Sequence, residues 1–171
     1  GCERIHYGVE AGTDRILKVL KKGITLEQVR EAFRLTRKAG ISTLAYFMIG
    51  SPRETKEDIS KTIKLAKELN PDFAHITVTT PFPATELYSQ GLKEGIISYD
   101  YWREFAQNPK KDFQTIYWEK ILSRKELFEL LNYAYKSFYS RPGYIVKALL
   151  KVRSPGELKR KIKAGWKVLR W

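Results

Sequence analysis

The spacing of three short apolar segments constrains the fold of this 171-residue chain more than any other feature. Residues 4–9, 41–49 and 73–80 are each typical of a β-strand and each is followed by a turn rich in glycine or proline. The segment 41–49 is nearly all apolar, which predicts a strand buried on both faces. Helical patterns separate the three segments. Two consecutive βαβ units of this kind predict a parallel sheet with right-handed crossovers.

Capping residues indicate where the helices begin. Thr13 is expected to cap a short helix that stops before Gly23, and residues 85–95 also have a helical pattern. Further helix starts are expected at Thr25 with Gln28, Thr55 with Asp58, Ser123 with Glu126, and Ser154 before Pro155.

The chain after Pro83 contains no convincing strand. Residues 99–139 include twelve aromatic residues, which favour the core of a helical extension and, less often, the lining of a cavity for a large hydrophobic substrate. We therefore expect two parts, residues 1–98 with the sheet and residues 99–171 as the extension. Three parallel strands bury little surface alone, which points to part of a larger sheet or barrel.

Basic residues are concentrated in the last part of the chain. Residues 141–171 hold ten Lys or Arg against one acidic residue, and so carry most of the net charge of +13. Clustered cations on amphipathic helices favour RNA binding, whereas Trp166 and Trp171 beside lysines favour attachment to an anionic membrane surface. Both alternatives stay open at this stage.

Other features limit the setting of the chain. The longest apolar run, Leu44 to Ile49, is far shorter than the ~20 residues of a membrane span. One cysteine, Cys2, forms no internal disulfide, which favours the cytoplasm. One cysteine and two histidines, His6 and His75, are too few ligands for a zinc or iron–sulfur site of the usual spacing. The chain lacks an initiator Met and opens almost directly on a strand, so we expect a part of a longer protein rather than a processed whole chain.

Polar and flexible residues follow each predicted strand, where ligands bind in parallel α/β folds. Glu10 offers a carboxylate, while Thr79 and Thr80 offer hydroxyls. Gly8, Gly12 and Gly50 would let a backbone approach a ligand closely. The plainer interpretation is ordinary turn chemistry with a solvated or salt-bridged Glu10.

Four segments together resemble the second half of a radical S-adenosylmethionine (SAM) domain. They are residues 8–14 (GVEAGTD), 19–25 (VLKKGIT), 47–55 (FMIGSPRET) and 80–88 (TPFPATELY). The resemblance extends to the group with an N-terminal cobalamin-binding domain, which includes methyltransferases and the anaerobic magnesium-protoporphyrin monomethyl ester cyclase. It implies an α/β fold in which half of a partial (β/α)6 barrel, with three parallel strands, precedes an α-helical C-terminal extension.

The resemblance also implies cofactors. Proteins of this family reduce SAM at a [4Fe–4S] cluster held by a Cys-x-x-x-Cys-x-x-Cys motif, and some carry cobalamin. That motif is absent, and Cys2 does not match it. We therefore expect the parent protein to be an enzyme, the missing N-terminal half to be this chain's partner, and the chain alone to be inactive. Methylation, cyclisation and methylthiolation all remain open as the parent reaction.

Site residues follow from the motifs as implications of the resemblance. Glu10 matches a position facing the ribose or amino acid part of SAM, and Lys22 one facing its carboxylate. The stretch of Ile49 and Gly50 matches one lying along the adenine, and Thr79, Thr80 and Pro81 match backbone that pairs with the adenine edge.

Some positions depart from the family pattern or have plainer interpretations. Ala11 stands where Ser is usual, and Arg53 replaces the second glycine of Gly-x-Pro-Gly-Glu-Thr. Lys22 would also suit the C-terminal end of a helix. His6 and His75 are more typical of strand residues with satisfied rings than of ligands.

An open half-barrel would leave one strand edge unpaired. We expect the edge of the first strand to be covered by a second copy of the chain, or by the aromatic extension folding back over it.

Overall fold

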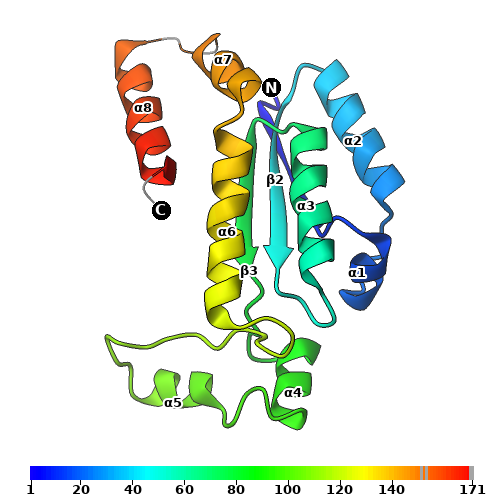
Figure 1. Cartoon of the computed structure of the whole chain (residues 1–171), viewed down its shortest axis with the longest axis vertical. Coiled ribbons are helices and arrows are strands. Elements are labelled where there is room, and N and C mark those ends of the chain that lie inside the picture. The colour runs from blue at the N-terminus through cyan, green and yellow to red at the C-terminus, as the bar shows by residue number, and fades with distance from the viewer. Residues whose placement is uncertain (151, 153, 170–171) are drawn as a thin grey trace.

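The computed structural model describes residues 1–150, 152 and 154–169. Its centre is a parallel sheet in the order β1-β2-β3, formed by β1 (Arg4–Glu10), β2 (Ser42–Ile49) and β3 (Phe73–Val78) (Figure 1). Ala45 of β2 pairs with Tyr7 of β1 and Ala74 of β3. The predicted α/β fold with three parallel strands is confirmed.

Helices α1 (Asp14–Val19), α2 (Leu26–Lys38) and α3 (Lys56–Leu69) follow the first two strands and lie on the same side of the sheet (Figure 1). Thr25 with Gln28 and Thr55 with Asp58 form the predicted capping boxes. Each box satisfies backbone N–H groups that the first helical turn leaves unpaired. Helix α3 ends at Asn70, whose φ of 46° reverses the chain before Pro71.

Only one face of the sheet is buried. Odd-numbered residues of β2, such as Ala45 and Phe47, lie under the helices, whereas Tyr46 is exposed on the other face. The prediction that the segment 41–49 is buried on both faces is therefore wrong for the described chain. The open face also carries the exposed side chains of His6 and His75.

The extension contains α4 (Glu86–Lys93), α5 (Tyr101–Gln107), α6 (Arg124–Tyr139), α7 (Pro142–Leu150) and α8 (Pro155–Leu169). The sequence predicted an α-helical extension but no start for α5 or α7. Helix α6 runs along β3, and its Leu127, Leu131 and Phe138 belong to the same core as the strands (Figure 1). The expected division at residue 98 therefore does not separate two cores.

Most aromatic residues of the extension pack into cores, as the plainer interpretation expected. On α6, Tyr135, Phe138 and Tyr139 join the main core, while Tyr101 packs with Tyr88 and Ile97 in a smaller cluster. Phe113 stacks on Tyr101 at 5.8 Å between ring centroids. A groove of about 230 Å³ beside this cluster leaves some of these rings accessible.

The two edges of the sheet differ. The outer edge of β3 meets the hydroxyls of Tyr135 and Tyr139 from α6. The aromatic extension thus covers the edge of β3 and not that of β1, while cover of the β1 edge by a second copy of the chain stays a prediction. Among the described residues, no helix is long and apolar enough to cross a bilayer.

Candidate functional site

The carboxyl ends of the three parallel strands lie at one end of the molecule, on the side of α4 and α5 (Figure 1). The loops that leave these ends are residues 11–13, 50–55 and 79–85. Ligands of parallel α/β folds bind at this end of the sheet.

Glu10 and Lys22 form an ion pair at the end of β1. The Lys22 Nζ lies 2.9 Å from Glu10 Oε1, and the Glu10 side chain is 16% exposed. A bulge between Gly8 and Glu10, with a φ of 68° at Glu10, turns the carboxylate toward Lys22. A Cβ at Gly8 would lie 2.5 Å from Glu10 Oε1, so the glycine leaves room for the pair. The structure therefore brings together the two charged residues that the sequence singled out.

Gly12 and Gly50 serve packing rather than access to a ligand. A Cβ at Gly12 would lie 2.4 Å from the backbone of Thr62, whose hydroxyl accepts a hydrogen bond from the Gly12 N–H. A Cβ at Gly50 would lie 2.7 Å from Leu127 of α6, and Gly50 has a φ of 77°. Both glycines are buried against helices.

Several other predicted site atoms are engaged inside the protein. The side chain of Ile49 is fully buried in the main core and cannot stack on an adenine at the strand ends. The Thr79 hydroxyl is buried against Ser51, with 3.0 Å between the two oxygens. The carbonyl of Pro81 accepts a hydrogen bond from the Trp102 indole at 3.3 Å. These contacts leave neither the Ile49 side chain nor the Thr79 hydroxyl facing a ligand, while the pairing of the backbone of Thr79, Thr80 and Pro81 with an adenine stays a prediction.

Thr80 remains accessible. It is half-buried, and its hydroxyl donates to the carbonyl of Val78 at 3.3 Å. Glu10, Lys22 and Thr80 are thus the predicted residues whose polar side-chain atoms remain available at this end of the sheet.

Glu54 is a buried carboxyl that sequence reasoning did not assign to the site. Its side chain lies in the loop after β2, where Oε2 accepts a hydrogen bond from the Ser51 N–H at 2.9 Å. Oε1 is buried without a hydrogen-bond partner within the described structure. Burial raises the pKa of Glu54 to about 7, although the backbone N–H groups of Ser51 and Gly50 oppose the rise.

Arg53 occupies the position where the family pattern has glycine. Its φ is 62°, which is the left-handed conformation that favours glycine, so the loop keeps its course at a cost in strain. The Arg53 carbonyl accepts a hydrogen bond from Arg15, which also pairs with Asp58. Burial raises the pKa of Asp58, but hydrogen bonds from Thr55 and the charge of Arg15 outweigh it and hold the pKa below its ordinary value.

His6 and His75 flank Tyr46 on the open face of the sheet. The Tyr46 hydroxyl lies 3.2 Å from His6 Nδ1, and its ring meets the His75 ring edge-on at 5.6 Å. His75 Nδ1 lies 3.4 Å from the Tyr135 hydroxyl. Both imidazoles therefore have tyrosine partners, as the plainer interpretation expected, and Tyr46 is the residue that the apolar pattern of its strand concealed.

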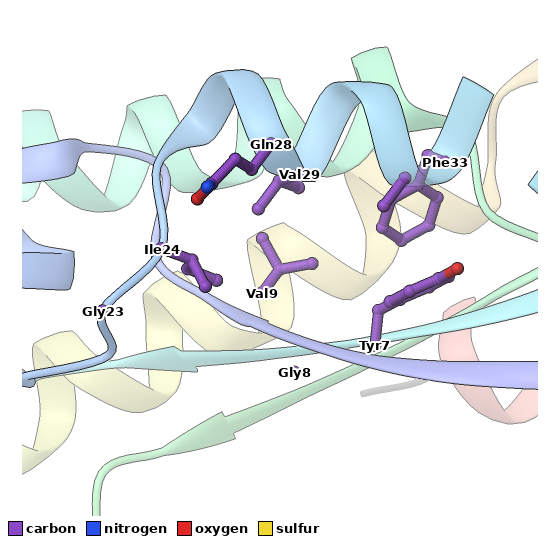
Figure 2. Close-up of a pocket in the computed structure, with 9 residues that line it drawn as sticks. Tyr7, Gly8, Val9, Gly23, Ile24, Gln28, Val29 and Phe33 are labelled. Carbon is purple, nitrogen blue, oxygen red and sulfur yellow. The ribbon is translucent and has the colours of Figure 1, made fainter. Parts of the chain in front are cut away.

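A groove of about 350 Å³ lies beside the outer edge of β1, between the strand and α2. Figure 2 shows Val9, Ile24 and Val29 lining it, with Tyr7 beneath Phe33. The Tyr7 hydroxyl is engaged with Thr36 at 2.6 Å. The lining is mainly apolar, so the groove suits the packing of another structural element better than chemistry.

An iron–sulfur cluster does not fit the residues of this chain. Cys2 is its only cysteine. Within the described residues, no three His, Cys, Asp or Glu side chains come close enough together to hold a metal ion. An iron–sulfur cluster would therefore need ligands from outside these 171 residues.

Comparisons with known proteins agree with this fold. Residues 1–66 match the model of the radical SAM superfamily. An uncharacterised methyltransferase of Pyrococcus horikoshii is 34% identical over 147 residues, which is 86% of this chain and 31% of that protein. The anaerobic magnesium-protoporphyrin IX monomethyl ester cyclase of Cereibacter sphaeroides is 35% identical over 142 residues, covering 82% of this chain and 22% of that protein.

More distant similarities cover less or concern the fold alone. A tRNA-2-methylthio-N(6)-dimethylallyladenosine synthase of Pseudomonas savastanoi is 35% identical over 85 residues, which is 48% of this chain and 19% of that protein. The structure of an N-terminally truncated Elp3 from Methanocaldococcus infernus superimposes with a TM-score of 0.56 at 24% identity, covering 78% of this chain and 26% of the other. The chain thus spans about a third or less of these relatives. Together with the parallel sheet, the matches place residues 1–66 in the radical SAM superfamily.

Proposed function

We propose that this chain supplies the SAM-binding strand ends of a radical SAM enzyme whose remaining barrel strands come from other residues of the same protein. The observation that carries the proposal is the Glu10–Lys22 pair at the carboxyl end of β1, within the segment that matches the superfamily. The groove beside β1 supports it, because a further strand and helix would cover that apolar surface.

The chain's own residues would act on SAM by binding and orienting it. SAM carries a sulfonium, an amino acid group and a ribose. The Glu10 carboxylate would accept hydrogen bonds from the ribose hydroxyls or the ammonium, and the Lys22 ammonium would pair with the carboxylate of the ligand. Thr80 would lie beside the adenine. The cluster, when bound, would supply the electron that cleaves SAM, and its ligands are assigned here to the rest of the protein.

The reaction that we propose for the parent protein is methyl transfer or cyclisation. Relatives that match more than four-fifths of this chain include an uncharacterised methyltransferase and two cyclases, whereas the methylthio-group synthase matches about half of it. Cobalamin is included through the resemblance of the motifs, and no side chain of this chain is assigned to it. The proposed setting is the cytoplasm, in keeping with a single cysteine.

SAM affinity tests the proposal. The parent protein with a reconstituted cluster would be compared with its Glu10→Gln and Lys22→Met variants by equilibrium dialysis, with cluster absorbance recorded for each. Both variants should bind SAM several-fold more weakly and keep the absorbance, because the cluster ligands lie elsewhere. Lys21→Met is the matched control, since Lys21 pairs with the exposed Glu86 instead.

The isolated chain provides the second part of the test. Without the cluster it should bind SAM weakly and yield no 5′-deoxyadenosine under reducing conditions. Unchanged affinity in both variants would remove Glu10 and Lys22 from the site. Cleavage of SAM by the isolated chain would overturn the assignment of the cluster ligands to other residues.

A further inference from the structure

Helix α7 presents an exposed aliphatic face. Ile145, Val146, Leu149 and Leu150 follow the spacing of one helical face, and their exposed fractions range from 46% at Ile145 to 82% at Leu150. None of these side chains can form a hydrogen bond. Contiguous exposed apolar residues of this kind mark interaction surfaces.

The orientation of α7 is fixed by polar contacts on its other side. The Tyr144 hydroxyl donates to the carbonyl of Asp72 at 2.9 Å, and Lys147 pairs with the Asp72 carboxylate at 3.2 Å. Just before the helix, Arg141 donates to the carbonyl of Lys67 at 2.8 Å. Since these contacts lock α7 onto the start of β3, its aliphatic face is directed away from the core.

Helix α8 adds cations beside further apolar side chains. Ile162 and Trp166 lie one turn apart, and both are more than half exposed. Lys159, Arg160 and Lys163 are exposed next to them, and none makes an ion pair in the part of the chain that the structure describes. The Lys161 ammonium donates to the carbonyl of Ala148 at 2.9 Å, which ties α8 to α7.

We propose that this α7–α8 surface docks onto an anionic lipid bilayer. It comprises Ile145, Val146, Leu149, Leu150, Lys159, Arg160, Ile162, Lys163 and Trp166. The aliphatic side chains enter the boundary between headgroups and acyl chains, while the cations meet the lipid phosphates. This inference goes beyond the proposed function and does not depend on it.

The composition of the surface separates a bilayer from other occupants. RNA is held by cations and by aromatic side chains that stack on bases, and the four aliphatic residues of α7 offer neither. A second copy of the chain would bring a tail with the same excess of positive charge against this one. An anionic bilayer matches both parts of the surface, because it combines negative charge with an apolar interior.

The surface also lies away from the proposed SAM site. Helix α7 contacts Asp72 at the beginning of β3, whereas Glu10 lies at the carboxyl end of β1 (Figure 1). Docking would therefore leave the strand-end loops accessible. It also means that loss of bilayer binding and loss of SAM binding can be distinguished in one protein.

Vesicle co-sedimentation of the full chain tests the proposal. Vesicles of phosphatidylcholine with phosphatidylglycerol should bind the chain, vesicles of phosphatidylcholine alone should bind it much less, and added salt should weaken the binding. The double variant Lys159→Glu, Lys163→Glu should bind at least about thirtyfold more weakly, since each cation near an anionic bilayer contributes about 1 kcal/mol. The double variant Leu149→Ser, Leu150→Ser should lose about tenfold or more.

Matched controls change the same chemistry elsewhere on the surface. Lys38→Glu with Lys111→Glu changes the net charge equally, and Leu35→Ser with Ile121→Ser removes exposed apolar side chains outside the α7–α8 surface. Both controls should bind more tightly than the variant that they match. Circular dichroism of every variant shows whether its fold is kept.

Three results would overturn the proposal. One is binding to the mixed vesicles that the leucine variant does not weaken, because the contact would then be purely electrostatic. Another is tighter binding to single-stranded RNA than to the vesicles. The third is self-association in sedimentation that the leucine variant abolishes while vesicle binding is absent, which would assign the surface to a second copy.

Discussion

The two outer edges of the sheet differ in what covers them. Along β3, Tyr139 accepts a hydrogen bond from the Ala74 N–H at 3.1 Å and donates to the Ala74 carbonyl at 2.8 Å. Tyr135 does the same for Ile76, at 3.1 and 3.0 Å. At the other edge, β1 pairs only with β2 among the described residues, and an apolar groove of about 350 Å³ runs beside it.

This difference shows which edge of the sheet is covered within the described residues. An open strand edge is a template for another strand, and proteins cover or block such edges. Two tyrosine hydroxyls take the place of a neighbouring strand on the β3 side, so α6 belongs to the fold of the sheet rather than to a separate extension. The β1 side has no comparable cover in the described structure, which is where we propose that further barrel residues pack.

Removing the tyrosine hydroxyls should have the largest effect on stability. The double variant Tyr135→Phe, Tyr139→Phe leaves the N–H and carbonyl groups of Ala74 and Ile76 without these partners. Each unsatisfied buried group costs about 1–3 kcal/mol of stability. Because water can reach the freed groups near the partly buried Tyr135, we expect the free energy of unfolding to fall by about 2–4 kcal/mol in total. Urea unfolding followed by circular dichroism measures it.

Tyr133→Phe is the matched control for this double variant. Tyr133 lies on the same helix and its ring is exposed. Removing its hydroxyl should therefore change the free energy of unfolding by less than about 0.5 kcal/mol. The double variant should also aggregate more readily, because the edge of β3 becomes available for pairing. Equal stability of the double variant and the control would show that the β3 edge is held by apolar packing alone.

Two glycines on the β1 side should respond very differently to alanine. At Gly12 the new Cβ would meet the backbone of Thr62 at 2.4 Å, and backbone cannot move aside cheaply. Overpacking of this kind costs about 1–3 kcal/mol. At Gly8 the new Cβ would meet only the ends of the Glu10 and Lys22 side chains, which can rotate away.

Thermal and urea unfolding of Gly12→Ala and Gly8→Ala test this contrast. We expect a loss of about 2–3 kcal/mol for the first variant and less than about 1 kcal/mol for the second. A similar loss in both would mean that the Glu10–Lys22 pair is as rigid as the contact between Gly12 and α3. That result would extend the well-packed part of the molecule to the end of β1.

The loop after β2, which Leu127 of α6 covers at Gly50, should show a pH dependence. An unfolded glutamate ionises near pH 4.3, and burial raises the pKa of Glu54 to about 7 in the fold. The folded state therefore binds a proton more tightly between these values. The stability contributed by Glu54 is full below about pH 4 and is lost as the pH rises to about 7.

Glu54→Gln isolates this contribution, because the amide does not titrate and its oxygen can still accept the Ser51 hydrogen bond. The free energy of unfolding of the variant should equal that of the unmodified chain near pH 4.5. Near pH 7.5 it should be higher by about 1–2 kcal/mol, a figure that allows for relaxation of the loop. Urea unfolding at both pH values gives the difference. A constant difference across this range would show that the carboxyl of Glu54 does not change its protonation state on folding.

The sequence predicted what depends on neighbouring residues. The three strands, the capping boxes and the Thr13 cap all follow from patterns a few residues long. The contacts of Tyr135 and Tyr139 with β3 join residues 59 and 65 positions apart, and no local pattern encodes them. The one-sided burial of the strand at residues 42–49 was missed for a different reason, because a nearly uniform apolar strand does not reveal which of its faces is buried.

The smallest expected effect concerns Arg53, which holds a glycine-like conformation in the loop after β2. A non-glycine residue at a φ of 62° costs about 1–2 kcal/mol of stability, which glycine would avoid. Glycine also has greater freedom in the unfolded chain, and this entropy offsets part of the gain. Arg53→Gly should therefore stabilise the protein by about 0.5–1 kcal/mol. The hydrogen bond from Arg15 survives, because it ends on the backbone carbonyl of residue 53.

Lys21→Gly carries the same test to the β1 side, since Lys21 has a φ of 53° and its ion pair with Glu86 is exposed on both sides. Such exposed pairs contribute little, so this variant should also gain up to about 1 kcal/mol. Lys64→Gly, within α3, should instead lose about 1 kcal/mol because glycine is a poor helix former. Urea unfolding of the three variants decides the matter. A lower free energy of unfolding in Arg53→Gly, with a gain in Lys21→Gly, would mean that the Arg53 side chain stabilises its loop by more than the backbone strain costs. The backbone strain would then matter at Lys21 but not in the loop after β2.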